Sequence, residues 1–267
     1  MNDREGFVLQ VVCIKQVPDT ETRVKIAPSG AAISETDVAN WIVSPYDEFA
    51  VEEALRIREA RGGEVVLVTA GPERAQAALR TGLAMGADSA VHVKDAALDA
   101  ADTLGTARAL AAAIRTLAPF DLVLCGQQGV GGDHSQVPGM LAELLDLPQV
   151  TVAVKIEIGD GKATVEREVD GGRETWETPL PALVSAQKGL NDPRYASLKG
   201  IMAAKKKTIQ ALDLAALGLD ALAVAPKVRI TAMELPPARP AVRMIEGDPQ
   251  TQAQELIRLL HEEAKVI

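Results

Sequence analysis

The sequence predicts an α/β fold, with an open, mostly parallel, doubly wound sheet, added β ribbons and a C-terminal arm. Short valine-rich runs alternate with segments of helical period, as in parallel strands joined by right-handed crossovers. Apolar residues make up 47% of the 267 residues and aromatic residues only 3%, which favours close packing of helices on a sheet. We expect one large domain at residues 1–225, followed by a linker and arm at residues 226–267.

The first half of the chain supplies the expected strands and helices in order. A strand at residues 8–14 precedes a turn or small hairpin at residues 25–30. Ser44 is an expected helix N-cap, with Pro45 in the first helical position and Asp47 where the acid of a capping box belongs. Further strands are expected at residues 64–69, 89–93 and 121–125, and further helices at residues 73–84 and 103–117.

The second half of the chain changes to β ribbons. A two-strand ribbon turns at Asp170-Gly171-Gly172, a buried strand covers residues 182–185, and the chain breaks at residues 191–193. A Pro-rich stretch at residues 235–240 precedes an amphipathic helix at residues 250–264. One short helix buries little apolar surface, so this last part is not expected to form a core by itself.

The charge pattern excludes several classes of function. The net charge is −9, and the single basic run is Lys205–Lys207, so a nucleic-acid surface is not expected. The N-terminal residues are polar and unlike a targeting peptide, and no apolar run approaches the roughly 18 residues of a membrane span. These features predict a cytoplasmic protein without direct membrane insertion.

The two cysteines, Cys13 and Cys125, each lie in an apolar run without CxxC spacing. We expect both to be buried, reduced thiols. The three histidines are far apart in the sequence, so no metal site is expected, and no catalytic constellation is visible.

A glycine-rich loop at residues 126–135 follows one expected strand and precedes a helical segment. In open parallel sheets, ligands bind beyond the carboxyl ends of the strands, where glycines let backbone N–H groups approach a phosphate. The spacing matches neither a Walker loop nor a dinucleotide fingerprint, so the pattern alone also fits a structural turn. Cys13, residues 44–47 and residues 70–71 fall at strand ends or at a helix start, and could line one crevice with the loop.

Residues 189–207 have the composition of a docking loop. Leu198 and Ile201-Met202 lie between the break at residues 191–193 and the lysine run. An apolar anchor rimmed by charge is how a protein surface grips a partner. The alternatives are that Leu198 packs on its own short helix and that the lysines are a solvated helix end.

Several motifs in one register resemble those of electron-transfer flavoprotein β subunits, and together they span roughly residues 8–210. They are VVCIKQV at 11–17, SPYDEFAVEEAL at 44–55, TGLAMGAD at 81–88, DLVLCGQQ at 121–128, VEREVDGGRE at 165–174, PALVS at 181–185 and LNDPRYASL at 190–198. The resemblance implies that residues 1–225 form a Rossmann-like, adenine-nucleotide-binding domain.

In members of this family of the usual type, the matching positions hold AMP. The resemblance implies an adenine pocket from Cys13, residues 44–47 and Ala70, with the phosphate held by residues 126–137. The implied nucleotide-binding residues are Cys13, Ser44, Pro45, Tyr46, Asp47, Ala70, Gly126, Gln127, Gln128, Gly129, Val130, Gly131, Gly132, Asp133, His134, Ser135, Gln136 and Val137.

The resemblance also implies partners. Residues 189–207 would recognise a dehydrogenase, the arm would pack on an α subunit that holds most of the FAD, and residues 17–20 would form one wall of the flavin site. Electrons would pass from acyl-CoA or related dehydrogenases, as in fatty acid oxidation, to a quinone oxidoreductase or another acceptor. The chain would have no catalytic turnover of its own. The implied partner-binding residues are Tyr195, Leu198, Ile201, Met202 and Lys206.

Two other functions stay open. Val137-Pro138, where the AMP-binding type often has threonine, and residues 17–20 resemble the electron-bifurcating branch, in which a second FAD replaces AMP and NADH supplies electrons. Residues 45–55 resemble the AMP-binding type, which we favour. A stand-alone adenine-nucleotide sensor or hydrolase would instead be a stable monomer that does not need an exposed Leu198.

Overall fold

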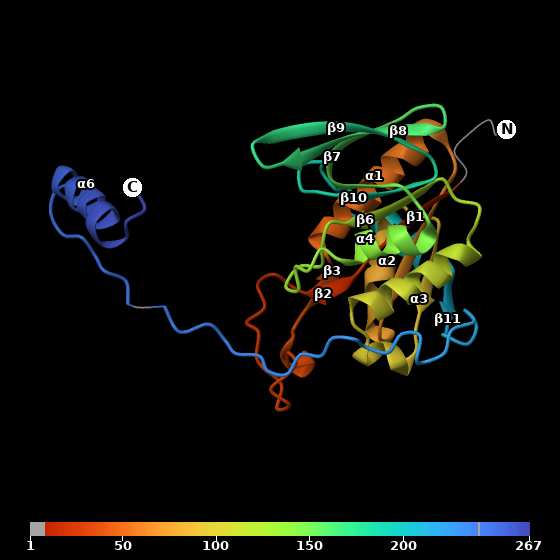
Figure 1. Ribbon diagram of the computed structural model, residues 1–267, viewed down its shortest axis with the longest axis horizontal. Helices are drawn as coiled ribbons and strands as arrows, with labels where there is room; N and C mark the ends of the chain where they lie inside the picture. The colour runs from red at the N-terminus through yellow and green to blue at the C-terminus, as the bar shows by residue number, and fades with distance from the viewer. Residues whose placement is uncertain (1–8, 240) are drawn as a thin grey trace. The chain divides into compact units, whose positions relative to one another are not determined.

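The computed structural model describes residues 9–239 and 241–267. The chain divides into two compact units after Ala232. The larger unit contains a nine-stranded sheet, shown in Figure 1. Its strands are β1 (Leu9–Cys13), β4 (Glu64–Ala70), β5 (Ser89–Val93), β6 (Leu122–Gly126), β7 (Gln149–Ile158), β8 (Lys162–Val169), β9 (Gly172–Pro179), β10 (Ala182–Ala186) and β11 (Ile209–Leu212).

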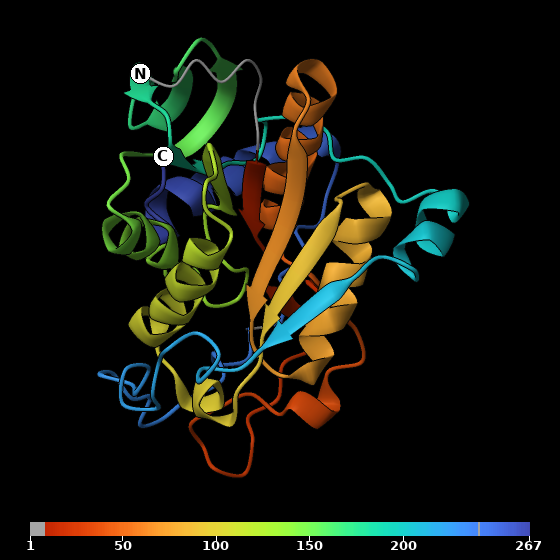
Figure 2. The same cartoon turned by 90° about the vertical axis from the view of Figure 1, so that its right-hand side faces the viewer.

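The strands lie in the order β11-β5-β4-β1-β6-β10-β7-β8-β9. Neighbours from β11 to β7 are parallel, and β8 and β9 continue the sheet as an antiparallel ribbon. Figure 2 shows β4, β5 and β11 side by side at one end of this sheet. The predicted open, mostly parallel α/β fold with an added ribbon is therefore confirmed.

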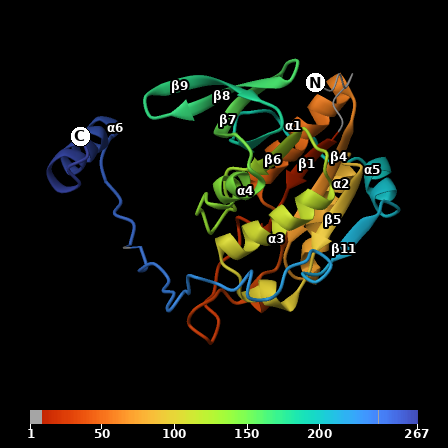
Figure 3. The ribbon, with the colours of Figure 1, turned by 45° about the vertical axis from the view of Figure 1, so that its right-hand side comes forward.

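Helices cover both faces of the parallel part of the sheet (Figure 3). They are α1 (Pro45–Arg61), α2 (Gln76–Met85), α3 (Thr103–Thr116) and α4 (Val137–Leu145), and two further helices follow in the sequence, α5 (Leu198–Ala204) and α6 (Pro249–Arg258). Val12 and Leu67 pack in one core with α1 and α2, while Val11 and Val66 pack in the other with α3 and α4. Successive strand residues point to opposite faces of the sheet, and helices cover each face. The residues on both faces must therefore be apolar, which explains the unbroken valine-rich runs.

Several element boundaries differ from the expectations. The strand expected at residues 8–14 is β1, and both Val8 and the N-terminal residues judged unlike a targeting peptide lie outside the described residues. The helix expected from Glu73 begins with a 3-10 turn before α2. The turn expected at residues 25–30 is wider, because Ile26 bridges Ile33. The C-terminal helix ends as α6 at Arg258 and continues into a π-helical turn.

Two features lacked a sequence signal. Strands β2 (Gln16–Pro18) and β3 (Trp41–Val43) form a separate antiparallel pair, and β11 forms the edge of the main sheet. These strands have only three or four residues, too few for an alternating pattern to emerge. The pair joins the end of the β1 segment to the start of α1, and so helps to place both at the same edge of the sheet.

After β11 the chain packs on α3. Leu214 and Val224 are buried in the core on the α3 side. The carboxylate of Asp102 accepts hydrogen bonds from the backbone N–H groups of Lys227 (2.6 Å) and Val228 (3.2 Å). Contacts with the sheet domain therefore continue to Val228.

The smaller unit contains α6, and Asp248 caps this helix by accepting hydrogen bonds from the backbone of Gln250 and Thr251. No residue of α6 is buried, so its apolar side chains remain uncovered. Among the residues that the structure describes, no helix combines the length and the apolar character that crossing a membrane requires.

Candidate functional site

The candidate site lies where the strand order reverses. From β1 the chain adds β4 and β5 on one side and then returns to place β6 on the other side. Ligands of such sheets bind at this switch point, beyond the carboxyl ends of the strands. Cys13, Ala70 and Gly126 lie at or near the carboxyl ends of β1, β4 and β6. The structure therefore brings together the strand-end positions that the sequence singled out.

Asp47 ties the first turn of α1 to this edge of the sheet. Its carboxylate is buried and accepts hydrogen bonds from the backbone N–H of Lys15 (2.7 Å) and of Gly126 (2.9 Å). Both donors lie where a strand ends, so their N–H groups need a partner from another element. Burial raises the pKa of Asp47 to about 7, although the two backbone donors favour its ionised form.

The predicted capping box at the start of α1 is wrong. Ser44 makes no side-chain hydrogen bond that caps the helix. Its hydroxyl instead donates to the carbonyl of Gln128 (3.3 Å) and accepts from the backbone N–H of Val130 (3.4 Å). The Asp47 carboxylate accepts its hydrogen bonds from the backbone of Lys15 and Gly126, not from the first turn of the helix. Both side chains thus hold the glycine-rich loop rather than the helix terminus.

Two glycines allow close approach inside the site. A Cβ atom on Gly126 would lie 2.3 Å from Oδ1 of Asp47 and 2.7 Å from its backbone nitrogen, so only glycine fits there. A Cβ atom on Gly129 would lie 2.7 Å from Cδ of Lys15 and 3.0 Å from its Nζ. By contrast, positions Gly131 and Gly132 have no atom closer than 3.8 Å to such a Cβ. The outer part of the loop is therefore bare backbone, as a phosphate cradle requires.

The loop between β6 and α4 has a strained backbone. Asp133 and Ser135 adopt φ values of 51° and 53°, which non-glycine residues rarely adopt. The Gln128 side chain supports them, because its amide donates to Oδ1 of Asp133 (3.0 Å) and its oxygen accepts from the Ser135 hydroxyl (2.7 Å). Such strain costs about 1–3 kcal/mol for each residue and is concentrated at functional sites.

Two further features favour a bound ligand. The side-chain oxygen of Gln127 is buried, and no described residue donates a hydrogen bond to it. Gln136 precedes α4 without a side-chain cap, so the positive end of the α4 dipole is open at the end of the loop. A nucleotide with donor groups and a phosphate fits this combination. His134, between these positions, is exposed.

Lys15 belongs to the site in addition to the residues that the sequence predicts there. Its side chain is exposed and lies over Gly129, and its backbone N–H is held by Asp47. It follows β1 by two residues, so the rule that selected Cys13 could have found it. Its ammonium group supplies a positive charge beside the bare backbone of the loop.

Cys13 and Cys125 are free thiols on adjacent strands and are both buried, as expected. The neighbouring Cys13 thiol and burial raise the pKa of Cys125, so it stays protonated at neutral pH. Within the described ranges, no three His, Cys, Asp or Glu side chains are grouped so that they could hold a metal ion.

The predicted docking residues form an exposed apolar patch on and beside α5. Tyr195 is 99% exposed and Leu198 is 84% exposed, and Ile201 and Met202 are exposed as well. Ser197 caps the helix by accepting a hydrogen bond from the backbone N–H of Gly200 (3.0 Å). Because Leu198 is so exposed, its side chain buries little apolar surface against its own helix. Of the lysine run, Lys205 and Lys206 are exposed, whereas Lys207 is half-buried.

Comparisons with known proteins agree with this architecture. The family described as "Electron transfer flavoprotein domain" matches residues 33–217. The electron transfer flavoprotein subunit beta of Bacillus subtilis (strain 168) is 43% identical over 257 residues, which cover 96% of this chain and 98% of that protein. The subunit beta of Mycobacterium tuberculosis (strain ATCC 25618 / H37Rv) is 45% identical over 215 residues, 79% of this chain and 80% of that protein. That of Syntrophomonas wolfei is 41% identical over 257 residues, 96% of this chain and 97% of that protein. This similarity over nearly the whole chain shows that the protein belongs to the electron-transfer flavoprotein β subunits, a family of electron-transport proteins.

Proposed function

We propose that this chain pairs with an α subunit, binds AMP at the switch point of its sheet, and docks a flavin dehydrogenase through residues 189–207. The observation that carries the nucleotide proposal is the glycine-rich loop, whose backbone is held by Ser44 and Asp47 and whose Asp133 and Ser135 side chains are held by Gln128, with Gly131 and Gly132 bare. Membership of the family supports a flavin in the complex, which the α subunit would mainly hold.

AMP would have a structural role. Cys13, residues 44–47 and Ala70 would surround the adenine, and the loop N–H groups with the α4 N-terminus would hold the phosphate. Lys15 would neutralise part of the phosphate charge. The alternative is the bifurcating type, with FAD at this position. Val137-Pro138 favours that alternative, whereas residues 45–55 favour AMP.

Identification of the extracted nucleotides tests this proposal. The heterodimer is denatured after purification, and the released nucleotides are quantified by mass spectrometry. We expect one AMP and one FAD for each heterodimer. Two FAD and no AMP would establish the bifurcating type instead, and a stable monomer that binds an adenine nucleotide without any α subunit would support a sensor or hydrolase.

A Lys15→Met variant is expected to retain AMP about tenfold less tightly, because a charge-assisted hydrogen bond to the phosphate is lost. Lys162→Met is the control, since it removes the same charge from β8, where Lys162 pairs with the exposed Glu177. AMP affinity measured after nucleotide removal should fall only in the first variant. Equal affinities in both variants would show that Lys15 does not contact the phosphate.

The proposed electron path begins at an acyl-CoA or related dehydrogenase. Its electrons would pass to the FAD and then, one at a time, to a quinone oxidoreductase or another acceptor. Residues 17–20 would form one wall of the flavin site. Val17 is buried in β2, and Thr20 is exposed just beyond it, so the second residue is accessible to a partner.

The C-terminal arm is proposed to pack on the α subunit. It exposes several apolar side chains, which are Leu235, Val242, Met244, Leu256 and Ile257. Limited proteolysis is expected to cleave the isolated chain after Ala232 and to spare the same region in the heterodimer, because association would bury these side chains. Equal resistance of the arm in both states would contradict the proposal.

A further inference from the structure

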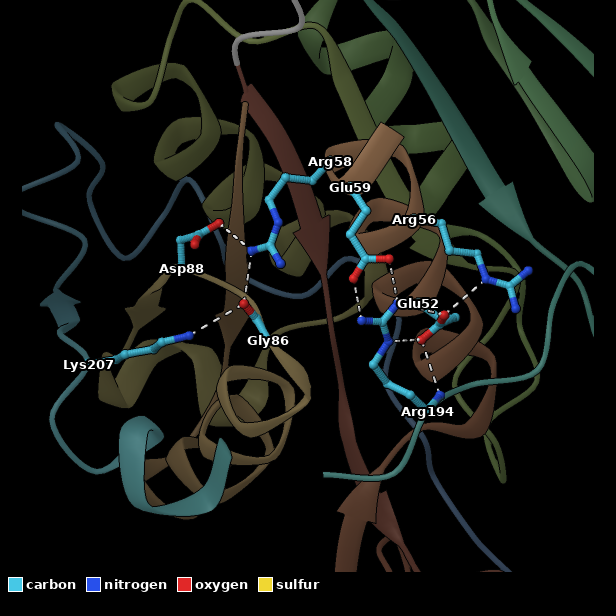
Figure 4. Close-up of polar contacts among 8 residues, drawn as sticks. All are labelled: Glu52, Arg56, Arg58, Glu59, Gly86, Asp88, Arg194 and Lys207. Carbon is cyan, nitrogen blue, oxygen red and sulfur yellow. Dashed lines mark hydrogen bonds and ion pairs between the residues drawn. The ribbon is translucent and has the colours of Figure 1, made fainter. Parts of the chain in front are cut away.

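The docking segment is attached to α1 by an arginine with two carboxylate partners. Figure 4 shows Arg194 between Glu52 and Glu59. Its guanidinium donates to Oε2 of Glu52 from Nε (2.8 Å) and to Oε1 of Glu52 from Nη2 (3.1 Å). It also donates to both oxygens of Glu59 (2.5 and 3.1 Å). The backbone N–H of Arg194 adds a further hydrogen bond to Glu52 (3.1 Å). We call this contact the arginine latch.

The arginine latch differs from an ordinary surface ion pair. Glu52 is only 3% exposed, and Arg56 donates a further hydrogen bond to it (3.0 Å). Burial alone would raise the pKa of Glu52, but the hydrogen bonds from Arg194 and Arg56 hold it below its ordinary value. Forked contacts to a buried carboxylate fix both distance and orientation, which a single exposed pair does not.

Asn191 strengthens the same attachment three residues earlier. Its side-chain amide donates to Oε2 of Glu53 (2.9 Å) and to the carbonyl of Phe49 (3.0 Å). Both partners lie on α1, as do Glu52 and Glu59. The irregular segment before α5 thus follows one helix surface, with no regular hydrogen-bond ladder of its own.

A second attachment holds the end of the segment to α2. The ammonium of Lys207 donates to the carbonyls of Leu83 and Gly86 (3.4 Å each) and of Ala87, where α2 ends. Burial lowers the pKa of Lys207. Cations stabilise a helix C-terminus, because its last carbonyls have no partner within the helix. We call this contact the lysine latch; Figure 4 shows its bond to Gly86, to which Arg58 also donates.

Helix α5 lies between the two latches and close against α2. A Cβ atom on Gly200 would lie 2.3 Å from the carbonyl oxygen of Ala84. Arg80 of α2 donates to the carbonyls of Ala204 (2.5 Å) and Lys207 (2.7 Å). Helix α5 is therefore held through its backbone as well as by the two latches, while Tyr195, Leu198 and Met202 stay exposed.

We propose that Arg194 and Lys207 are positioning residues, which hold the apolar patch around Leu198 in its binding geometry before the partner arrives. A preformed segment loses less conformational entropy on binding than a free loop, so the same apolar contacts give a higher affinity. This inference rests on the proposed docking function, and Leu198 itself supplies the contact.

The two latches also determine which positive charges around the apolar patch remain available to a partner. Arg194 is neutralised by Glu52 and Glu59, and the Lys207 ammonium is used within the chain. The positive charges left around the apolar patch are Lys199, Lys205 and Lys206, which are all exposed. The partner that fits is a flavin dehydrogenase with an apolar socket and an acidic rim.

An Arg194→Met variant tests the arginine latch in the complete heterodimer. Met keeps a similar apolar length but removes every hydrogen bond of the guanidinium. Without dehydrogenase, the backbone amides of residues 190–198 should exchange hydrogen about tenfold faster. In an assay with the flavoprotein as electron acceptor of an acyl-CoA dehydrogenase, KM for the flavoprotein should rise about tenfold with kcat at saturation unchanged.

Two comparisons keep this result interpretable. Arg194→Lys, which retains one charged donor, should fall between wild type and Arg194→Met in both measurements. Leu198→Ala should raise KM without changing amide exchange. If Leu198→Ala has no effect on KM, the docking function itself is wrong. If Leu198→Ala raises KM and Arg194→Met leaves it at the wild-type value, the docking function stands and the latch inference is overturned.

The lysine latch has a matched control within the same run. Lys207→Gln should increase amide exchange in α5 and raise KM, because the carbonyls at the end of α2 lose their ammonium partner. Lys206→Gln removes the same charge from an exposed side chain, so it should leave amide exchange in α5 unchanged and should raise KM only at low salt. Identical exchange and kinetics in the two variants would contradict a positioning role for Lys207.

Discussion

Replacement of Leu198 by alanine is expected to weaken coupling to the dehydrogenase by about one to two orders of magnitude. The side chain is 84% exposed in this chain, so nearly all of its apolar surface is available to a partner. Burial of one leucine contributes roughly 1.5–3 kcal/mol, which corresponds to this range of affinity. The quantity to measure is KM for the flavoprotein in electron transfer from the dehydrogenase.

Leu222→Ala is a suitable control, because Leu222 is 79% exposed but lies outside the docking segment. It should leave coupling unchanged. The melting temperature, AMP content and flavin spectrum should stay near wild type in both variants. If Leu198→Ala instead destabilises the heterodimer while electron transfer for each folded molecule is preserved, the segment is structural and the docking assignment is wrong.

Asp47→Asn is expected to remove a pH dependence of stability that the wild type shows between about pH 4 and pH 8. The ordinary pKa of this carboxyl is 3.8, and burial raises it to about 7 in the folded state. The proton is therefore bound more tightly by the folded chain. The stabilisation that comes from this tighter proton binding is complete at pH values below the ordinary pKa of 3.8, and it is lost as the pH rises through the folded-state pKa of about 7.

The difference between the ordinary pKa of Asp47 and its raised pKa in the folded chain is equivalent to about 4 kcal/mol of folding free energy. The measurement is the free energy of unfolding of wild type and Asp47→Asn at several pH values from 5 to 8.5. Relative to the variant, the wild type should lose stability as the pH increases and level off above about pH 8. Parallel curves for the two proteins would show that Asp47 does not titrate in this range.

The sheet could be predicted because its strands repeat one strong pattern. Runs such as residues 64–69 are apolar on both faces, and this requires helices on each side. The parallel order then places every strand end on one edge, which is why Cys13, Ala70 and Gly126 were found together. The short strands β2, β3 and β11 gave no comparable pattern, since tertiary contacts rather than periodicity define them.

The hydrogen-bond partners in the site were less predictable. Local spacing assigned Asp47 to a capping box, yet its partners are Lys15 and Gly126, which are 32 and 79 residues away. Arg194 and Glu52 are separated by 142 residues, and no local pattern connects them. The lysine run by itself predicts one block of charge, whereas the Lys207 ammonium bonds carbonyls at the end of α2. Such pairings depend on side-chain direction in the folded chain.

Helix α1 sets the spacing between the glycine-rich loop and the arginine latch, because it carries the residues that hold each of them. Asp47 lies in its first turn, and Glu52 and Glu59 follow five and twelve residues later, with the two glutamates two turns apart and on one face. At the usual rise for each residue, they lie about 8 Å and 18 Å from Asp47 along the helix axis. One inserted residue after Asp47 would rotate the glutamates by about 100°. The contacts of Asp47 with Lys15 and Gly126 would then be kept while Arg194 lost both carboxylates, so the length of α1 sets how the proposed docking segment is oriented relative to the glycine-rich loop.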